Sequence, residues 1–174
     1  MYDLPRIGVI AEAIKRELVR EFPGVPVRRS YRADIDLDDE PRGPVITVMP
    51  DDCAFDPTRS RDFLWQEVSL IVAVTAPLDA ESDTGGTLGE GWNDRIDPLV
   101  AIVERIQEIF TGGRIITADR VGDLDVTLVE GTHAEGAPLY DFDELIVNSR
   151  FLGVVNVHTR FEVPRDPNRL KGSA

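Results

Sequence analysis

The sequence is poor in the residues that most often carry cross-links or chemistry. Its 174 residues include one cysteine, Cys53, and two histidines, His133 and His158. A single cysteine excludes an intramolecular disulfide, so the composition favours a reducing compartment. No run of about 18 apolar residues occurs, which argues against a membrane-spanning helix. The first residues lack the basic stretch and apolar run of a secretory signal, so we expect none.

Positive charge is also scarce. The chain has 19 Lys and Arg against 32 Asp and Glu, which gives a formal net charge of −13. Proteins bind nucleic acid by displacing counterions from phosphates with Lys and Arg, so an acidic surface disfavours DNA binding and contact with anionic membranes. We therefore expect no nucleic-acid reader and no membrane partner. Such a surface can nevertheless face DNA without retaining it.

Apolar residues are sufficient for one compact core, at 42 % of the chain. A chain of this length usually forms a single domain. We expect one domain over residues 1–164, followed by a flexible tail over residues 165–174, and we find no internal repeat.

The N-terminal half has two different hydrophobic periods. Apolar residues at steps of three and four predict a helix over residues 4–22, which Pro23 and Gly24 end. Alternation over residues 25–37 then predicts a long strand with one wet face. A return strand at 45–49 would complete a hairpin, and residues 50–58 read as a polar loop. Residues 63–76 are apolar on both sides, which indicates a central strand.

The C-terminal half adds a second helix and further strands. Asp97 and Pro98 open or kink this helix, and Gly112–Gly113 end it. The other expected elements are a long loop at 77–91, short strands at 114–118 and 124–130, a Gly-rich loop at 131–138, a helical turn at 140–147 and a strand at 151–163. The order predicts an α+β fold, with a mainly antiparallel β-sheet and two helices packed on one face.

The acidic run that begins at Asp34 resembles a calcium loop only superficially. An EF-hand needs Gly at its sixth position and Glu at its twelfth, and counting from Asp34 those places hold Asp39 and Val45. The alternation also places Asp34, Asp36 and Asp38 on one strand face. We interpret them as a solvated acidic face, and a weak divalent-cation site is the alternative.

The remaining candidate residues lack the partners that chemistry requires. Neither histidine has a metal-ligand spacing such as HExxH, and neighbouring carboxylates disfavour a reactive Cys53 thiolate. No Lys-Ser or Lys-Thr follows the glycines of residues 85–91, so they form no phosphate loop. We expect no catalytic residue, no cofactor and no metal site, and therefore a protein that is not an enzyme.

Segments near both ends resemble a known family. Residues 140–145 (YDFDEL) form a short acidic turn before the last strand, 151–161 (FLGVVNVHTRF). At the other end, a helix closing in FPGV at 22–25 precedes a charged strand and the segment PVITVMP at 44–50. This order of elements resembles the tail-terminator (tail-completion) proteins of long-tailed bacteriophages, over roughly residues 4–161. The loop at 77–91 and the stretch 117–138 are extra length relative to small members.

The resemblance implies a structural protein of the virion. Members of that family form a homo-oligomeric ring, commonly a hexamer, on the head-proximal end of the tail tube. The ring ends tube polymerisation and joins the tail to the neck. The implied partners are further copies of the chain, the tail tube protein, a neck or head-closure protein and, where present, a sheath protein. DNA would pass through without specific binding, and assembly would take place in the host cytoplasm.

Two groups of residues are candidates for the ring's working surfaces. Acidic residues are expected at the lumen or rim: Asp34, Asp36, Asp38, Asp79, Glu81, Asp83 and Glu90. Loop residues are expected at partner contacts: Gly85, Gly86, Trp92, His133 and Tyr140. The alternatives are a head-closure or neck adaptor protein, an enzyme or metal-binding domain, and a cellular acidic binding module.

Overall fold

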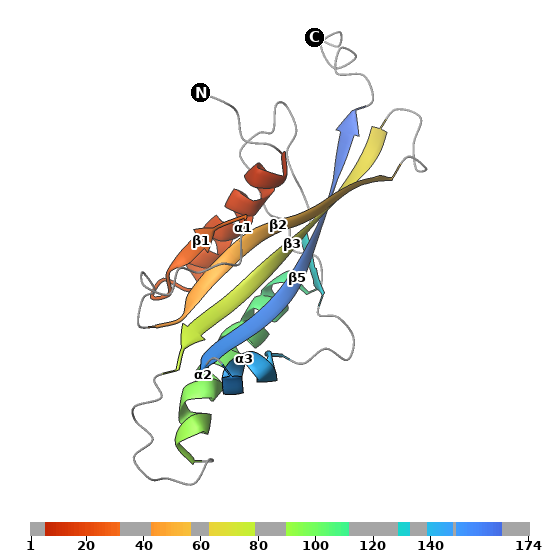
Figure 1. The fold of residues 1–174 in the computed structure, drawn as a ribbon. Helices are drawn as coiled ribbons and strands as arrows, with labels where there is room; N and C mark the ends of the chain where they lie inside the picture. Colours follow the sequence, from red (N-terminus) through yellow and green to blue (C-terminus); the bar gives the residue numbers. More distant parts are fainter. Residues whose placement is uncertain are drawn as a thin grey trace.

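A five-stranded sheet forms the centre of the molecule. The computed structural model describes residues 6–31, 43–56, 63–78, 90–111, 129–132, 139–147 and 149–164. Its elements are α1 (Arg6–Glu21), β1 (Val27–Arg29), β2 (Val45–Asp56), β3 (Phe63–Pro77), α2 (Glu90–Phe110), β4 (Val129–Thr132), α3 (Phe142–Val147) and β5 (Arg150–Pro164). The strand order is β1-β2-β3-β5-β4 (Figure 1).

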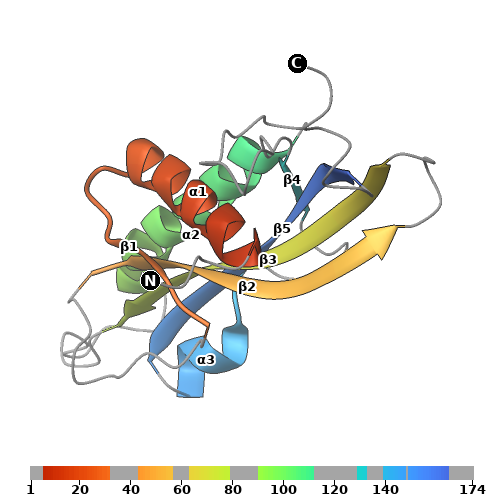
Figure 2. The same cartoon turned by 90° about the horizontal axis from the view of Figure 1, so that it is seen from above.

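The expected α+β class is confirmed, including the two helices on one face. Helices α1 and α2 lie together on the same side of the strands, whereas α3 lies apart from them (Figure 2). α1 contacts β1 and β2, and α2 contacts β3, β5 and β4. The helix layer therefore follows the order of the sheet, with α1 over one edge and α2 over the other. All strand pairs except β1–β2 are antiparallel.

Helix α1 forms because one of its faces is apolar at helical spacing. Ile10, Ile14 and Leu18 are at most 1 % exposed and pack on the sheet. The helix ends at Glu21, just before Pro23 and Gly24, as the sequence predicts.

Strand β3 occupies the centre of the sheet, as its apolar residues predict. It pairs along its whole length with β5, from Phe63 opposite Pro164 to Pro77 opposite Arg150. On its other side it pairs with β2. Val68 and Val72 are fully buried beneath the helices, and Ala73, which points to the opposite side, is 4 % exposed. Long antiparallel pairing on both sides makes β3 the structural axis of the fold.

The expected N-terminal hairpin is wrong. β1 contains only three residues, Val27–Arg29, and it pairs with β2 in parallel, with Val27 opposite Ile46. Ser30 and Tyr31 lie outside the strand, and residues 32–40 lie outside the described part of the chain. Alternation of polar and apolar residues reports which side a residue faces, and it carries no information on the direction of the partner strand.

Strand β2 is longer than expected, and residues 50–56 belong to it instead of to a loop. Pro50 pairs with Leu70 and Asp52 with Ser69, so Asp51 is the extra residue of a β-bulge. A bulge accommodates proline because it interrupts the hydrogen-bond ladder in which proline cannot donate. The proline that suggested a loop therefore marks an irregularity inside a strand.

Helix α2 begins at Glu90, so Pro98 lies inside the helix and does not open it. Asp97 and Pro98 are both exposed, whereas Leu99, Val103, Ile106 and Phe110 form a buried stripe. Packing of that stripe on the sheet outweighs the local cost of proline.

The structure also differs from the sequence-based prediction near β4. Val129 and Glu130 fall in the expected strand, but Gly131 and Thr132, expected in a loop, continue it opposite β5. The strand expected at 114–118 and the tail 165–174 lie outside the described residues.

Helix α3 confirms the helical turn expected before the last strand. The Asp141 carboxylate Oδ1 accepts hydrogen bonds from the backbone N–H groups of Asp143 at 2.9 Å and Glu144 at 3.1 Å. It therefore acts as the N-cap of α3. The backbone N–H of Asp141 also donates to the carbonyl of Leu152 in β5, at 2.8 Å, which ties the start of α3 to the sheet.

We predict that Asp141→Ala lowers the free energy of unfolding by about 1 kcal/mol, because two backbone donors lose their acceptor. Urea denaturation measures the change. Asp141→Asn is the matched control, since asparagine caps helices about as well as aspartate. Equal losses in the two variants would contradict a capping role.

Candidate functional site

Most of the residues chosen from the sequence as ring surfaces lie outside the described residues. These are Asp34, Asp36, Asp38, Asp79, Glu81, Asp83, Gly85, Gly86 and His133. Glu90 and Trp92 are placed in the first turn of α2. For this group the sequence-based prediction stays a prediction.

Tyr140 is the member of the loop group whose side chain the structure describes. It is partly buried against the core, and its ring centroid lies 5.8 Å from that of Phe151. An aromatic pair at this distance contributes to packing. The ring of Tyr140 is therefore held inside its own subunit, beside the start of β5.

A Ser–His pair lies on the sheet face opposite α1 and α2. Ser69 of β3 and His158 of β5 are direct cross-strand neighbours, and Ser69 Oγ lies 3.0 Å from His158 Nδ1. A nucleophile also needs donors that stabilise an oxyanion, usually free backbone N–H groups. Both residues lie within strands paired along the ladder, so the neighbouring backbone donors are committed to the sheet. We interpret the pair as a cross-strand polar contact.

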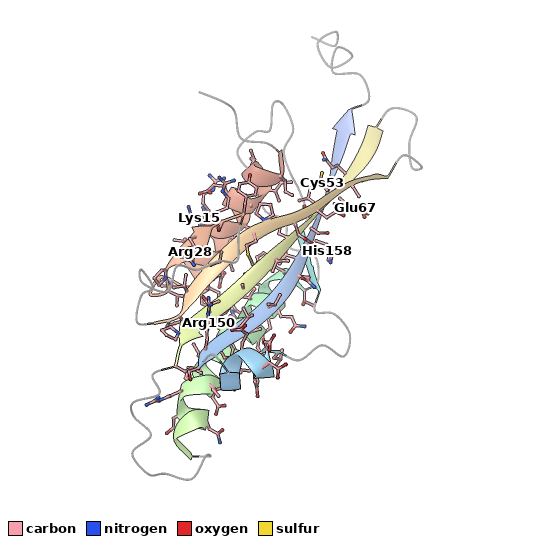
Figure 3. The ribbon with its side chains drawn as sticks, in the orientation of Figure 1. Lys15, Arg28, Cys53, Glu67, Arg150 and His158 are labelled. Atoms are coloured by element: carbon pink, nitrogen blue, oxygen red, sulfur yellow. The ribbon has the colours of Figure 1, made fainter. Side chains whose placement is uncertain are left out.

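Cys53 lies on the same extended part of the sheet, as Figure 3 shows together with Glu67 and His158. It is exposed, and its sulfur accepts a hydrogen bond from the Gln66 side chain. Within the described ranges, no group of three or more His, Cys, Asp or Glu side chains is placed to hold a metal ion. No helix in those ranges is long and apolar enough to cross a membrane.

A surface that the sequence analysis did not single out lies on α1 and β1. Residues 6–31 contain six Lys or Arg, three Glu and no Asp, in a chain whose net charge is −13. We use the name basic edge for its side chains Lys15, Arg16, Val19, Arg20, Arg29 and Tyr31. The excess of Lys and Arg over Glu in residues 6–31 could have indicated this surface, but the negative net charge of the whole chain pointed the other way.

Ion pairs join the two elements of the basic edge. Glu12 of α1 receives Lys15 Nζ at 2.7 Å and Arg29 Nε at 3.6 Å, so β1 is tied to the outer side of α1. The Arg29 guanidinium lies over the ring of Tyr31, 5.4 Å from its centroid. Lys15 lies on the α1 side of the molecule in Figure 3. One glutamate thus positions two cations, and one of these orients an aromatic ring.

The basic edge also carries exposed apolar surface. Tyr31 is 61 % exposed and Val19 is 46 % exposed, and these are the exposed large apolar side chains of the described residues. Because Val19 follows Glu12 by two helical turns, the two share one side of α1. β1 is an edge strand, with a strand neighbour on one side only in the described sheet. Basic, aromatic and edge-strand features therefore coincide.

Helix α2 presents the opposite charge. Asp94, Asp97, Glu104 and Glu108 are exposed and follow one another at helical spacing, with exposed Ala101 between them. We call these four carboxylates the acidic stripe. It extends for roughly 21 Å along the helix, from the rise of ~1.5 Å per residue. Its C-terminal part borders an open hollow of about 530 Å³, whose described lining residues are Glu104, Gln107, Glu108 and Thr111.

Arg105 connects α2 to α1 through a partly exposed ion pair. Its Nη2 lies 3.3 Å from Glu21 of α1, and its Nη1 lies 3.1 Å from Glu108. The hydrogen bond to Glu108, followed by the one to Glu21, raises the pKa of Arg105. Gln107, in the hollow, is about 200° around the helix from Arg105. Glu108 borders the hollow and is also bonded to Arg105, so the hollow lies on the solvent-facing side of α2, beside the ion pair with α1.

Comparison with protein-family models finds no match for this chain, and comparison with curated proteins finds none either. The resemblance stated above therefore rests on the sequence segments and the element order, and the two charged surfaces rest on the structure.

Proposed function

We propose that this protein is a structural component of a phage tail, a terminator that caps the head-proximal end of the tail tube as a ring. One observation carries the proposal: the short helix α3, with its acidic first turn, leads directly into the long final strand β5. This is the arrangement on which the resemblance rests. The elements before it also follow the implied order, from α1 through the sheet strands to α2.

The sheet supports an assembly role. Rings are built from heterologous contacts, in which one patch meets a different patch on the next subunit. β1 and β4 are the two edges of the described sheet, and edge strands are natural sites for contact with another chain. The acidic composition suits a channel that DNA crosses without adhering.

The test is disruption of the gene in the phage that carries it, followed by electron microscopy. A terminator is expected to leave tubes that grow beyond their normal length, because nothing stops polymerisation. Resupply of the intact chain should restore uniform tails. Normal-length tails that fail to join heads would contradict the terminator and favour a neck adaptor, and normal virions would contradict both.

A further inference from the structure

We infer that the basic edge of one copy docks head to tail onto the acidic stripe and hollow of α2 in a second copy. The inference deepens the proposed function. It rests on that function only in taking the assembly to be a closed ring. It identifies the two faces through which subunits of the ring would meet.

Charge complementarity identifies the occupant of the basic edge. With six Lys or Arg against three Glu, residues 6–31 are basic although the whole chain is strongly acidic. The acidic stripe has four exposed carboxylates on one helix face. At physiological ionic strength the screening length is about 8 Å, so repulsion between two acidic chains is damped at a distance while charges in contact still attract.

Side-chain chemistry supplies an anchor and a place for it. Interfaces are enriched in Tyr and Arg, and their strongest contacts are central residues that enter pockets on the partner. Tyr31, 61 % exposed with the Arg29 guanidinium over its ring, is such an anchor. The open hollow bordered by Glu104 and Glu108 offers acidic side chains to this pair.

The positions of the two faces suit repeated head-to-tail contact. Over the sheet, α1 lies on the β1–β2 side and α2 on the β5–β4 side. The basic edge is thus over β1 and β2, and the acidic stripe with its hollow is on the solvent-facing side of α2. The two faces are therefore different patches of the same chain. A contact between different patches of identical chains generates a ring or a filament.

Two variants isolate the two faces. The edge variant, Arg20→Glu with Tyr31→Ser, changes side chains that are 77 % and 61 % exposed, respectively. The hollow variant, Asp97→Lys with Glu104→Lys, changes two exposed carboxylates of the acidic stripe. The matched control for the hollow variant, Asp51→Lys with Asp52→Lys, changes two exposed carboxylates of β2 and raises the net charge by the same four units as the hollow variant. Circular dichroism establishes that each variant is folded.

Sedimentation velocity at physiological salt measures self-association. We expect the intact chain to associate, and each face variant to weaken association by about tenfold or more, as for loss of a central interface residue. The control should associate at least as well as the intact chain, because it lowers the overall repulsion. If the hollow variant behaves like the control, the acidic stripe is not the docking face, and a monomeric intact chain would also overturn the inference.

Mixing the two face variants tests the head-to-tail arrangement. The edge variant keeps an intact hollow and the hollow variant keeps an intact edge, so an equal mixture should give pairs of chains that grow no further. A mixture that stays monomeric would overturn the arrangement.

Tail-length complementation separates this inference from the proposed function. Face variants that fail to associate but still restore uniform tails would refute this interface and leave the terminator role standing. Association through these faces by a chain whose loss leaves tail length normal would refute the terminator role alone.

Discussion

Gly153→Ala is expected to lower the free energy of unfolding by about 3 kcal/mol, at the upper end of the usual cost of overpacking a core. A Cβ at this position in β5 would overlap the side chain of Val103 in α2. It would also lie only 3.1 Å from the carbonyl oxygen of Leu139 and from the ring of Phe151. The missing side chain is therefore what allows α2 to approach the sheet closely. Thermal unfolding of the dilute chain measures the loss.

A double-mutant cycle checks that this close approach is the cause. Val103→Ala alone removes buried methyl groups and is also expected to destabilise the protein. It should nevertheless relieve Gly153→Ala, so that the double variant is more stable than the summed losses by about 1 kcal/mol or more. Strictly additive losses would show that the added methyl group is accommodated elsewhere.

Leu18→Ala is expected to cost about 3 kcal/mol, within the range of 2–5 kcal/mol for truncation of a fully buried leucine. Leu18 is 0 % exposed in the core between α1 and the sheet. Its removal leaves a cavity at the C-terminal end of the only long helix that covers β1 and β2 in the described structure. Guanidinium denaturation provides the measurement, with an unchanged slope expected for a folded variant.

The neighbouring residue provides the control for Leu18. Val19 is 46 % exposed, so Val19→Ala should change stability by less than about 0.5 kcal/mol. The same substitution should weaken self-association, because Val19 belongs to the basic edge. A large loss of stability in Val19→Ala would contradict the exposed position of Val19, because alanine favours the helix more than valine does.

The core could be predicted from the sequence because the spacing of apolar residues indicates which side of a helix or strand is buried. The apolar stripe of α1, the buried side of β3 and the alternating residues Val155, Val157 and Thr159 of β5 are all buried as expected. The N-cap of α3 was not foreseen, but its helical turn was. These features depend on residues close together in the chain, where spacing decides the structure.

The features that depend on distant partners could not be predicted. The parallel pairing of Val27 with Ile46 is decided by the path of the intervening chain and not by either strand. The bulge at Asp51 depends on how β2 aligns with Leu70 and Ser69 of β3. Likewise, Pro98 suggested a helix start or a kink, but the helix begins at Glu90 and contains Pro98.

The candidate surfaces also divide into features that sequence spacing could indicate and features that depend on distant contacts. Residues chosen from acidic and Gly-rich segments lie largely outside the described chain, so their roles stay predictions. Sequence reasoning missed the basic edge because it weighed the net charge of the whole chain instead of its distribution. The two elements of that edge become one surface only through the contact of Arg29 with Glu12, which are 17 positions apart.

The central pairing of β3 with β5 has a consequence for synthesis on the ribosome. Val74 pairs with Gly153, so nearly half of the chain must emerge between the two strands. Until β5 is made, β3 carries a bare, apolar edge between residues 68 and 76, and unpaired strand edges promote aggregation. α1, β2 and β3 can associate early, whereas the sheet closes only when the last segment arrives. The order of translation thus makes the pairing of β5 with β3 a late step of folding, and leaves the nascent chain vulnerable just before it.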